Sequence, residues 1–102
     1  HISQFPENER ERVAEATWHE YERLINDSDD NFVQRLRQQH TEFKEADIQL
    51  CMLVRQKVIN AVIGNIYGIS DSAVKKRKAT LKKKGFQITD PTITLEQVVE
   101  QL

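Results

Sequence analysis

The segment from Ile59 to Gly85 constrains the fold of this chain more than any other. It contains a short apolar stretch, Gly68, and then Ser70 followed by a run of cations. Seven of the ten residues from Lys75 to Lys84 are Lys or Arg, and none is acidic. Two helices joined by a short turn that contains Gly, with the second helix basic, form the helix-turn-helix pattern of DNA-binding proteins. We therefore predict that this segment is the functional core and that its ligand is double-stranded DNA.

Charge is distributed unevenly along the chain. Residues 1–30 contain nine acidic side chains against three basic ones, whereas residues 53–84 contain nine basic side chains against Asp71 alone. The net charge of −1 therefore hides one anionic and one cationic region. This division predicts a cationic face for nucleic acid, with the anionic end directed away from it. The alternative is that the cationic run is only a solvated surface.

Length and composition favour a single soluble domain. A chain of 102 residues can bury a modest core, and its 38% hydrophobic and 30% charged residues are typical of a folded, helix-rich protein. No apolar run approaches the ~20 residues that a membrane helix requires, and nothing resembles a signal peptide. Because the sequence begins at His1 without Met, we expect a cytoplasmic domain excised from a longer protein. That parent protein could itself be anchored to a membrane upstream of His1.

The spacing of apolar residues predicts an all-α fold, a compact helical domain in which a long amphipathic helix precedes the helix-turn-helix. Six helices are expected. In chain order they cover residues 6–26, a segment from a cap at Asp29 or Asp30 to His40, and then residues 44–55, 60–67, 70–85 and 94–102. We divide the chain into a helical lead-in (1–41), a helix-turn-helix core (42–86) and a C-terminal extension with a short closing helix (87–102).

Caps and buried positions follow from the same pattern. Apolar side chains of the third and fourth expected helices should face the core: Ile48, Cys51 and Met52, with Leu50 and Leu53 as further candidates, and then Val62, Ile63 and Ile66. Gly68 suits the left-handed position that ends the fourth helix, and Gly85 is expected to close the fifth in the same way. Ser70 is the expected N-cap of the fifth helix, and Thr94 with Gln97 forms a capping box for the last one.

The first expected helix has a stripe formed by Trp18, Tyr21 and Ile25. Two accounts of this stripe remain open. In one, it packs on the second and third helices of its own chain. In the other, it joins two copies as a homodimer, which would suit a motif whose dimers occupy half-sites about one helical turn apart. A ligand pocket is not favoured, because no convergent polar groups accompany the stripe.

Residues spread over most of the chain match the pattern of one family: Trp18, Tyr21, Phe32, Leu36, Asp47 to Cys51, Leu53 to Arg55, Ile63, Ile66, Ile69, Ser70, Val74, Leu81, Lys83 and Lys84. From Phe43 to Gly85 the chain resembles the LuxR-type (GerE-type) C-terminal helix-turn-helix. From Trp18 to Leu102 it is similar to the variant that ends many tetratricopeptide-repeat and sensor-type bacterial regulators. The resemblance implies a DNA-binding output domain of a bacterial transcriptional regulator, preceded in the same parent chain by a sensor or repeat region.

Three positions depart from that pattern. Residues 59–62 (Ile-Asn-Ala-Val) replace a Ser/Thr cap followed by polar Lys-Glu. Gly64 replaces a small Ala, which weakens the helix by ~1 kcal/mol, and Gly85 replaces a Leu. The first helix of the motif is thus more apolar than the family pattern. A second interpretation therefore stays open, in which a degenerate helix-turn-helix acts as a protein–protein interaction module with an acidic partner.

The expected DNA contacts follow from how such motifs bind. The N-terminal part of the second helix meets base edges in the major groove, where Lys donates to guanine and Ala contacts the thymine methyl group. The candidates for base contacts lie on the face opposite Val74 and Leu81: Asp71, Ser72, Lys75, Lys76 and Ala79. The candidates for phosphate contacts are Arg55, Lys57, Ser70, Lys78, Lys82 and Lys83. Either Arg77 or Lys78 must cover apolar surface with its stem while its charge reaches solvent.

The sequence offers little for catalysis. Cys51 stands alone on an expected core face, which favours inert packing over a nucleophile or redox partner. His1, His19 and His40 have no metal-ligand spacing among themselves or with Cys51. No Gly-rich phosphate loop is present. We therefore expect no catalytic residue, no metal and no cofactor, and a protein that is not an enzyme.

Overall fold

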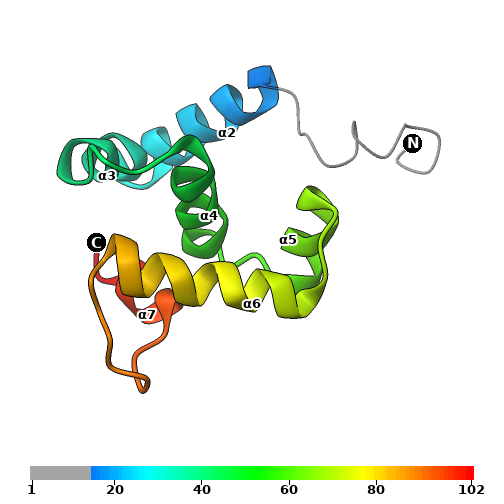
Figure 1. Ribbon diagram of the computed structural model, residues 1–102. Helices are drawn as coiled ribbons and strands as arrows, with labels where there is room; N and C mark the ends of the chain where they lie inside the picture. Colours follow the sequence, from blue (N-terminus) through cyan, green and yellow to red (C-terminus); the bar gives the residue numbers. More distant parts are fainter. Residues whose placement is uncertain (1–14) are drawn as a thin grey trace.

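Residues 15–102, the part of the chain that the computed structural model describes, form six α-helices and no strand (Figure 1). The helices are α2 (Glu15–Ser28), α3 (Phe32–Gln39), α4 (Glu45–Arg55), α5 (Asn60–Tyr67), α6 (Asp71–Thr80) and α7 (Leu95–Glu100), and α6 continues into the π-helical segment η2 (Leu81–Gly85). The predicted all-α class is confirmed for these residues. The beginning of the first expected helix, over residues 6–14, lies outside the described part.

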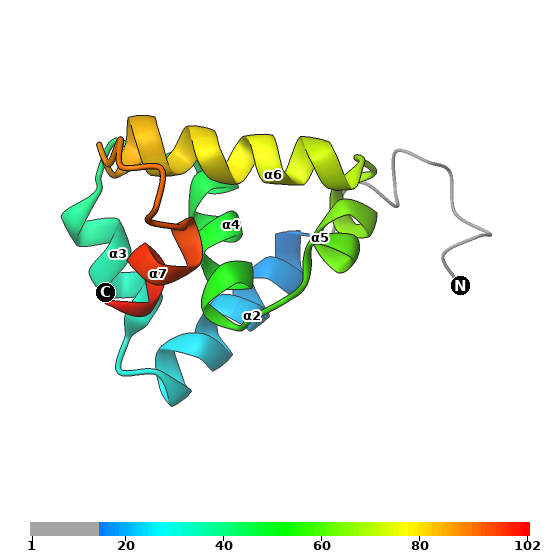
Figure 2. The same ribbon diagram turned by 90° about the horizontal axis from the view of Figure 1, so that it is seen from below.

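Helix α4 runs through the centre of the domain, between α2 and α6 (Figures 1 and 2). Its buried residues are Ile48, Leu50, Cys51, Met52, Leu53 and Val54. A helix that is apolar around most of its circumference must be covered on several sides, and the other helices pack around it. At its start, the backbone N–H of Lys44 donates to the Asp47 carboxylate at 3.0 Å, which satisfies one group that the helix itself leaves unpaired.

The connection between α2 and α3 corrects one expected cap. Neither Asp29 nor Asp30 caps α3: the N-cap position is Asn31, whose backbone is left-handed (φ 56°) and whose side chain makes no capping hydrogen bond. Instead, the side-chain oxygen of Asn26, in α2, accepts hydrogen bonds of 2.9 and 3.1 Å from two backbone N–H groups in the first turn of α3. A cap supplied by the preceding helix cannot be found from the residues next to the helix start.

The turn between α5 and α6 has the expected geometry. Gly68 is left-handed (φ 67°), as predicted. The backbone N–H of Ile69 donates to the carbonyl oxygen of Gly64 at 2.9 Å, which closes the turn. The hydroxyl of Ser70 then accepts a hydrogen bond of 3.1 Å from the first turn of α6, so its predicted N-cap role is confirmed.

Helix α5 buries less of its apolar surface than predicted. Ile63 is buried and Ile66 is half-buried, but the side chain of Val62 is 44% exposed, which contradicts its expected place in the core. Ile59, in the N-cap position, is 64% exposed. The reason is geometric: only one side of this eight-residue helix faces the core, so the outer side stays open to solvent.

Gly85 ends the cationic helix for a different reason from the one predicted. Its φ is not in the left-handed region, which Gln87 occupies instead (φ 58°). A Cβ atom on Gly85 would lie 2.7 Å from a methyl group of Leu81 and 3.1 Å from two ring atoms of Phe43. The position therefore requires Gly for space rather than for backbone freedom.

The C-terminal residues complete the same core. The backbone N–H of Thr94 donates to the Gln97 side chain at 2.9 Å, and the backbone N–H of Gln97 donates to the Thr94 hydroxyl at 3.1 Å, so the predicted capping box is confirmed. Leu95 and Val99 of α7 are buried in one cluster with Ile25 of α2. All three predicted segments (1–41, 42–86 and 87–102) therefore contribute to one core.

The turn after α5 generates a prediction about Gly64. A Cβ atom there would lie 2.6 Å from the carbonyl oxygen of Ile69, closer than a carbon can approach without movement of the backbone. We expect Gly64→Ala to lower the free energy of unfolding by about 1–3 kcal/mol in urea titrations followed by circular dichroism. This sign opposes helix propensity, which favours Ala by ~1 kcal/mol. Asn65→Ala, at the exposed neighbouring position, should leave stability unchanged or raised. A Gly64→Ala protein more stable than the wild type would contradict the close approach.

Candidate nucleic-acid interface

The outward face of α6 carries all five residues predicted to contact bases. Helix α6 lies along one edge of the domain (Figure 2) and is anchored by Val74 and Leu81, both buried. Asp71, Ser72, Lys75, Lys76 and Ala79 are all exposed. Lys75 lies 3.3 Å from the carboxylate of Asp71 one turn earlier, an exposed pair that costs little to separate.

Three of the predicted phosphate contacts remain on the surface. Lys83 is exposed in η2, and Lys57 is exposed in the turn before α5, where its backbone is left-handed (φ 61°). Ser70 is exposed, but its hydroxyl already serves as the cap of α6 and lies 3.2 Å from the hydroxyl of Ser72. Of these three, the two lysines make no side-chain hydrogen bond or ion pair with residues 15–102, so within this part of the chain their charge is available to a ligand.

Lys78 does not have the role predicted for it. Its stem covers apolar surface as expected, but its ammonium does not reach solvent, because the residue is only 8% exposed. The ammonium donates to the side chain of Asn60 at the start of α5 and to the carboxylate of Glu96 in α7, the latter at 2.6 Å. Partial burial works to raise the pKa of Glu96, but the hydrogen bond from Lys78, a backbone hydrogen bond and the charge of Lys78 together outweigh it, and the pKa lies below its usual value. Lys78 therefore joins α5, α6 and α7 instead of facing a phosphate.

Arg55 is likewise engaged within the domain. Its guanidinium pairs with Asp29 at 2.7 Å and donates at 2.7 Å to the carbonyl oxygen of Val99 near the end of α7. The guanidinium also lies 4.5 Å from the centre of the Phe32 ring, a cation–π contact. These contacts connect α4 with the α2–α3 turn and with α7. We therefore correct its expected phosphate contact to a structural role.

Lys82 is the third corrected assignment. Its ammonium donates to the carbonyl oxygens of Asp90 and Ile93, at 2.9 and 2.8 Å. These carbonyls belong to the connection between η2 and α7, a segment without regular structure that needs such partners. Lys82 thus holds this connection against the end of the cationic helix.

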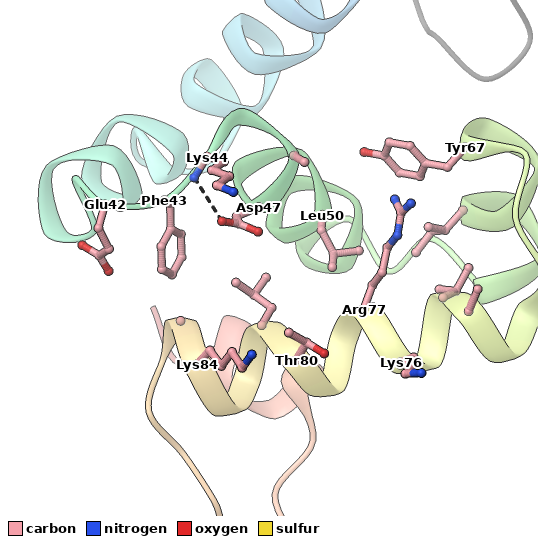
Figure 3. Close-up of a pocket in the computed structure, with 16 residues that line it drawn as sticks. Glu42, Phe43, Lys44, Asp47, Leu50, Tyr67, Lys76, Arg77, Thr80 and Lys84 are labelled. Atoms are coloured by element: carbon pink, nitrogen blue, oxygen red, sulfur yellow. Dashed lines mark hydrogen bonds between the residues drawn. The ribbon is translucent and has the colours of Figure 1, made fainter. Parts of the chain in front are cut away.

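Tyr67, the last residue of α5, was not singled out by the sequence patterns, and it lies beside Arg77 on the inner side of α6 (Figure 3). The guanidinium of Arg77 is 5.4 Å from the centre of the Tyr67 ring, and the other neighbour of that ring is Trp18, stacked at 6.4 Å. The Tyr67 hydroxyl donates to the side chain of Gln49 at 2.9 Å, and burial raises its pKa to about 12. The sequence pattern left open whether Arg77 or Lys78 would cover apolar surface; Lys78 is the buried one, whereas Arg77 stays exposed and lies against Tyr67.

The acidic helix α2 lies across α4 from α6 (Figure 1). Its residue Glu22 is held by Arg37 of α3 at 2.7 Å, and the same guanidinium binds Glu45 of α4 at 2.6 Å. The stripe on α2 packs on its own chain: Ile25 is buried, and Trp18 and Tyr21 are half-buried against the core. Among the described residues, acidic α2 and cationic α6 therefore lie on different sides of α4, and the pair between Asp29 and Arg55 joins the anionic and cationic regions between them.

The described residues give little support for thiol chemistry or for metal binding. Burial raises the pKa of the Cys51 thiol to about 12, with a smaller contribution from Asp47, so the thiolate is not formed near neutral pH. Residues 15–102 contain no group of three or more His, Cys, Asp or Glu side chains arranged to hold a metal ion. Within the same range, no helix is long and apolar enough to cross a membrane.

No protein-family model, curated protein or solved structure matches this chain. The geometry of the domain is therefore the basis for a proposal about its function. Helix α6 presents an exposed cationic face outward, and its buried cation, Lys78, ties it to two other helices.

The pair between Asp29 and Arg55 predicts a pH-dependent stability. Hydrogen bonds from Arg55 hold the pKa of Asp29 below its usual value, and partial burial opposes this only in part. A lowered folded-state pKa stabilises the fold above the unfolded-state value of ~3.9, and this stabilisation is lost as the pH falls towards the folded-state pKa. We expect Asp29→Asn to lower the free energy of unfolding by about 1–2 kcal/mol at pH 7.

Urea titrations at lower pH test whether the pair between Asp29 and Arg55 causes this loss of stability. The difference between wild type and Asp29→Asn in urea titrations should shrink as the pH falls below ~4, since the wild type then loses the charge as well. Asp30→Asn, in the same turn but exposed, should change stability by less than about 0.5 kcal/mol at pH 7. Equal effects of the two variants would show that the pair with Arg55 contributes nothing specific.

Proposed function

We propose that this domain binds double-stranded DNA as the output domain of a bacterial transcriptional regulator, with α6 in the major groove. One observation carries the proposal. Helix α6 and its continuation η2 bury Val74, Lys78 and Leu81 against the core, while the outward face of α6 holds Lys75, Lys76 and Ala79 in solvent. A rigidly anchored helix with a cationic, side-chain-rich outer face is what major-groove recognition requires.

The dimensions suit this placement. Helix α6 has ten residues and η2 adds five, which together make a rod about 20 Å long and narrow enough for the ~12 Å wide major groove. Helix α5 crosses the N-terminal end of this rod (Figure 2) and would meet the DNA backbone. Because α2 lies beyond α4, its carboxylates stay away from the phosphates in this placement.

The proposed contacts divide by position along α6. Near its N-terminal end, Lys75 and Lys76 donate to guanine, Ala79 contacts a thymine methyl group, and Asp71 accepts from a cytosine amino group. Ser72, on the same exposed face, hydrogen bonds a base edge or a nearby phosphate. Lys83 in η2 and Lys57 before α5 contact phosphates, which position the domain without selecting sequence.

The proposal extends to the context of the domain. A single helix of this size contacts one half-site, so affinity for an operator would come from two copies, joined as a homodimer or through the sensor or repeat region upstream. A regulator of this kind acts in the cytoplasm, where its DNA is. It requires no catalytic residue, metal or cofactor.

The salt dependence of binding tests the phosphate contacts. Each neutralised phosphate releases counterions and contributes about −0.9 to the slope of log K against log[salt]. In titrations of random duplex DNA at several salt concentrations, Lys83→Gln should flatten the slope by about that amount. Lys82→Gln removes the same charge one residue earlier, and its effect should be smaller because that ammonium is held by two carbonyl oxygens. An unchanged slope for a folded Lys83→Gln protein would refute the placement of η2 on the backbone.

A second prediction concerns sequence preference. Lys75→Ala or Lys76→Ala should relax the preference for one base pair, with a loss of ~1–3 kcal/mol for the preferred site over others in competition binding. Lys83→Ala should instead weaken all sequences equally, since phosphates carry no sequence information. If Lys75→Ala and Lys76→Ala both weakened all sequences equally, as is expected of Lys83→Ala, the recognition face would be assigned wrongly or the domain would be non-specific.

A further inference from the structure

A groove of about 800 Å³ lies between the beginning of α4 and the inner side of α6 (Figure 3). Its floor is apolar: the half-buried side chains of Phe43, Tyr67 and Ala73 border the buried core residues Leu50, Ile63, Val74 and Leu81. Neither the packing of the hydrophobic core nor the proposed DNA contacts explain the presence of this groove. It lies on the opposite side of α6 from the face that carries Lys75.

The charges around the groove are divided between its two walls. The α6 wall contributes Arg77, Lys76 and Lys84, all exposed. The other wall contributes Lys44, Glu42 and Asp47, and one oxygen of Asp47 already accepts the backbone N–H of Lys44. The lining therefore has an excess of cations, concentrated along α6 above an apolar floor.

The side chain of Arg77 is held at the edge of this groove by its contact with Tyr67. In Figure 3 its side chain leaves α6 towards Tyr67 and not towards the outer face of the helix. The ring of Tyr67 lies under the guanidinium at 5.4 Å, and it is fixed by stacking on Trp18 and by the hydrogen bond to Gln49. A guanidinium supported by an aromatic ring keeps its hydrogen-bond donors available for a planar carboxylate.

We infer that this groove binds an acidic segment of a partner protein, with a carboxylate on Arg77 and an apolar side chain on the floor around Leu50. Charge complementarity selects the occupant: cations line the α6 wall, and an Arg–carboxylate pair beside an apolar contact is a strong and directional combination. Duplex DNA does not fit this description, because it has no apolar side chain for the floor and its charged phosphates would have to face that floor. The inference goes beyond DNA binding, because Arg77 and the apolar lining take no part in the proposed DNA contacts, and Lys76 alone borders both surfaces.

The test uses the 102-residue chain and a short synthetic peptide in which Leu and Phe alternate with Asp and Glu. Trp18 is the only Trp in the sequence and stacks on the ring that supports Arg77, so its fluorescence reports binding, with calorimetry as the second measurement. Arg77→Gln should weaken peptide binding about tenfold. Lys75→Gln removes the same charge from the outer face and should weaken it less than about threefold.

A second peptide separates groove binding from general attraction between charges. When Leu and Phe are replaced by Ser at constant charge, affinity should fall about tenfold, because the apolar floor loses its contact. Equal losses for Arg77→Gln and Lys75→Gln, equal affinity of the two peptides, or no binding at low salt would each overturn the inference. Circular dichroism confirms that both variants are folded.

The same two variants distinguish this inference from the proposed function. In duplex DNA titrations, Lys75→Gln should reduce base preference and Arg77→Gln should leave it unchanged, the reverse of their order with the peptide. A protein that binds peptide but not DNA would refute the proposed function and leave the groove supported. One that binds DNA but not the peptide would refute only the groove.

Discussion

The burial of α4 on several sides is the constraint on which the rest of the structure depends. Because its apolar residues from Ile48 to Val54 point in nearly every direction, no single partner helix could cover them, and helices from both ends of the chain must pack around it. This arrangement places acidic α2 and cationic α6 on different sides of one helix (Figure 1). The separation of charge that makes a nucleic-acid face conceivable is therefore a consequence of core packing rather than of electrostatics alone.

The cations of the chain fall into two groups with different physical roles. Arg55, Lys78 and Lys82 donate to side-chain or carbonyl oxygens at the ends of α5 and α7 and in the connection between η2 and α7. Charged hydrogen bonds of this kind are strong when partly buried, and removing one partner strands the other. The remaining cations of α6 and η2 are exposed and carry the charge that a ligand can use.

Helix α6 thus presents two surfaces with different chemistry. Its outer face combines Lys75 and Lys76 with the small Ala79 and has no apolar floor, which suits a polar, highly charged groove such as that of DNA. Its inner side combines Arg77 with apolar residues and with two carboxylates from the opposite wall, which suits a mixed apolar and acidic peptide. Anchoring by Val74 and Lys78 keeps the helix in one orientation, so the two surfaces stay distinct.

The sequence by itself determined the helices, most of their caps and the inward residues of α4, because these depend on neighbours three or four positions away. It also determined that Lys75, Lys76 and Ala79 would share a face opposite Val74. It did not reveal that Asn26 caps α3, that a Cβ atom on Gly85 would crowd Leu81 and Phe43, or that Arg77 meets Tyr67, since these contacts depend on how separate segments pack. Whether a surface cation is free or engaged likewise depends on what packs beside it. Only the tertiary structure decided that Arg55, Lys78 and Lys82 are engaged within the domain, because their partners lie eight to forty-seven residues away in the chain.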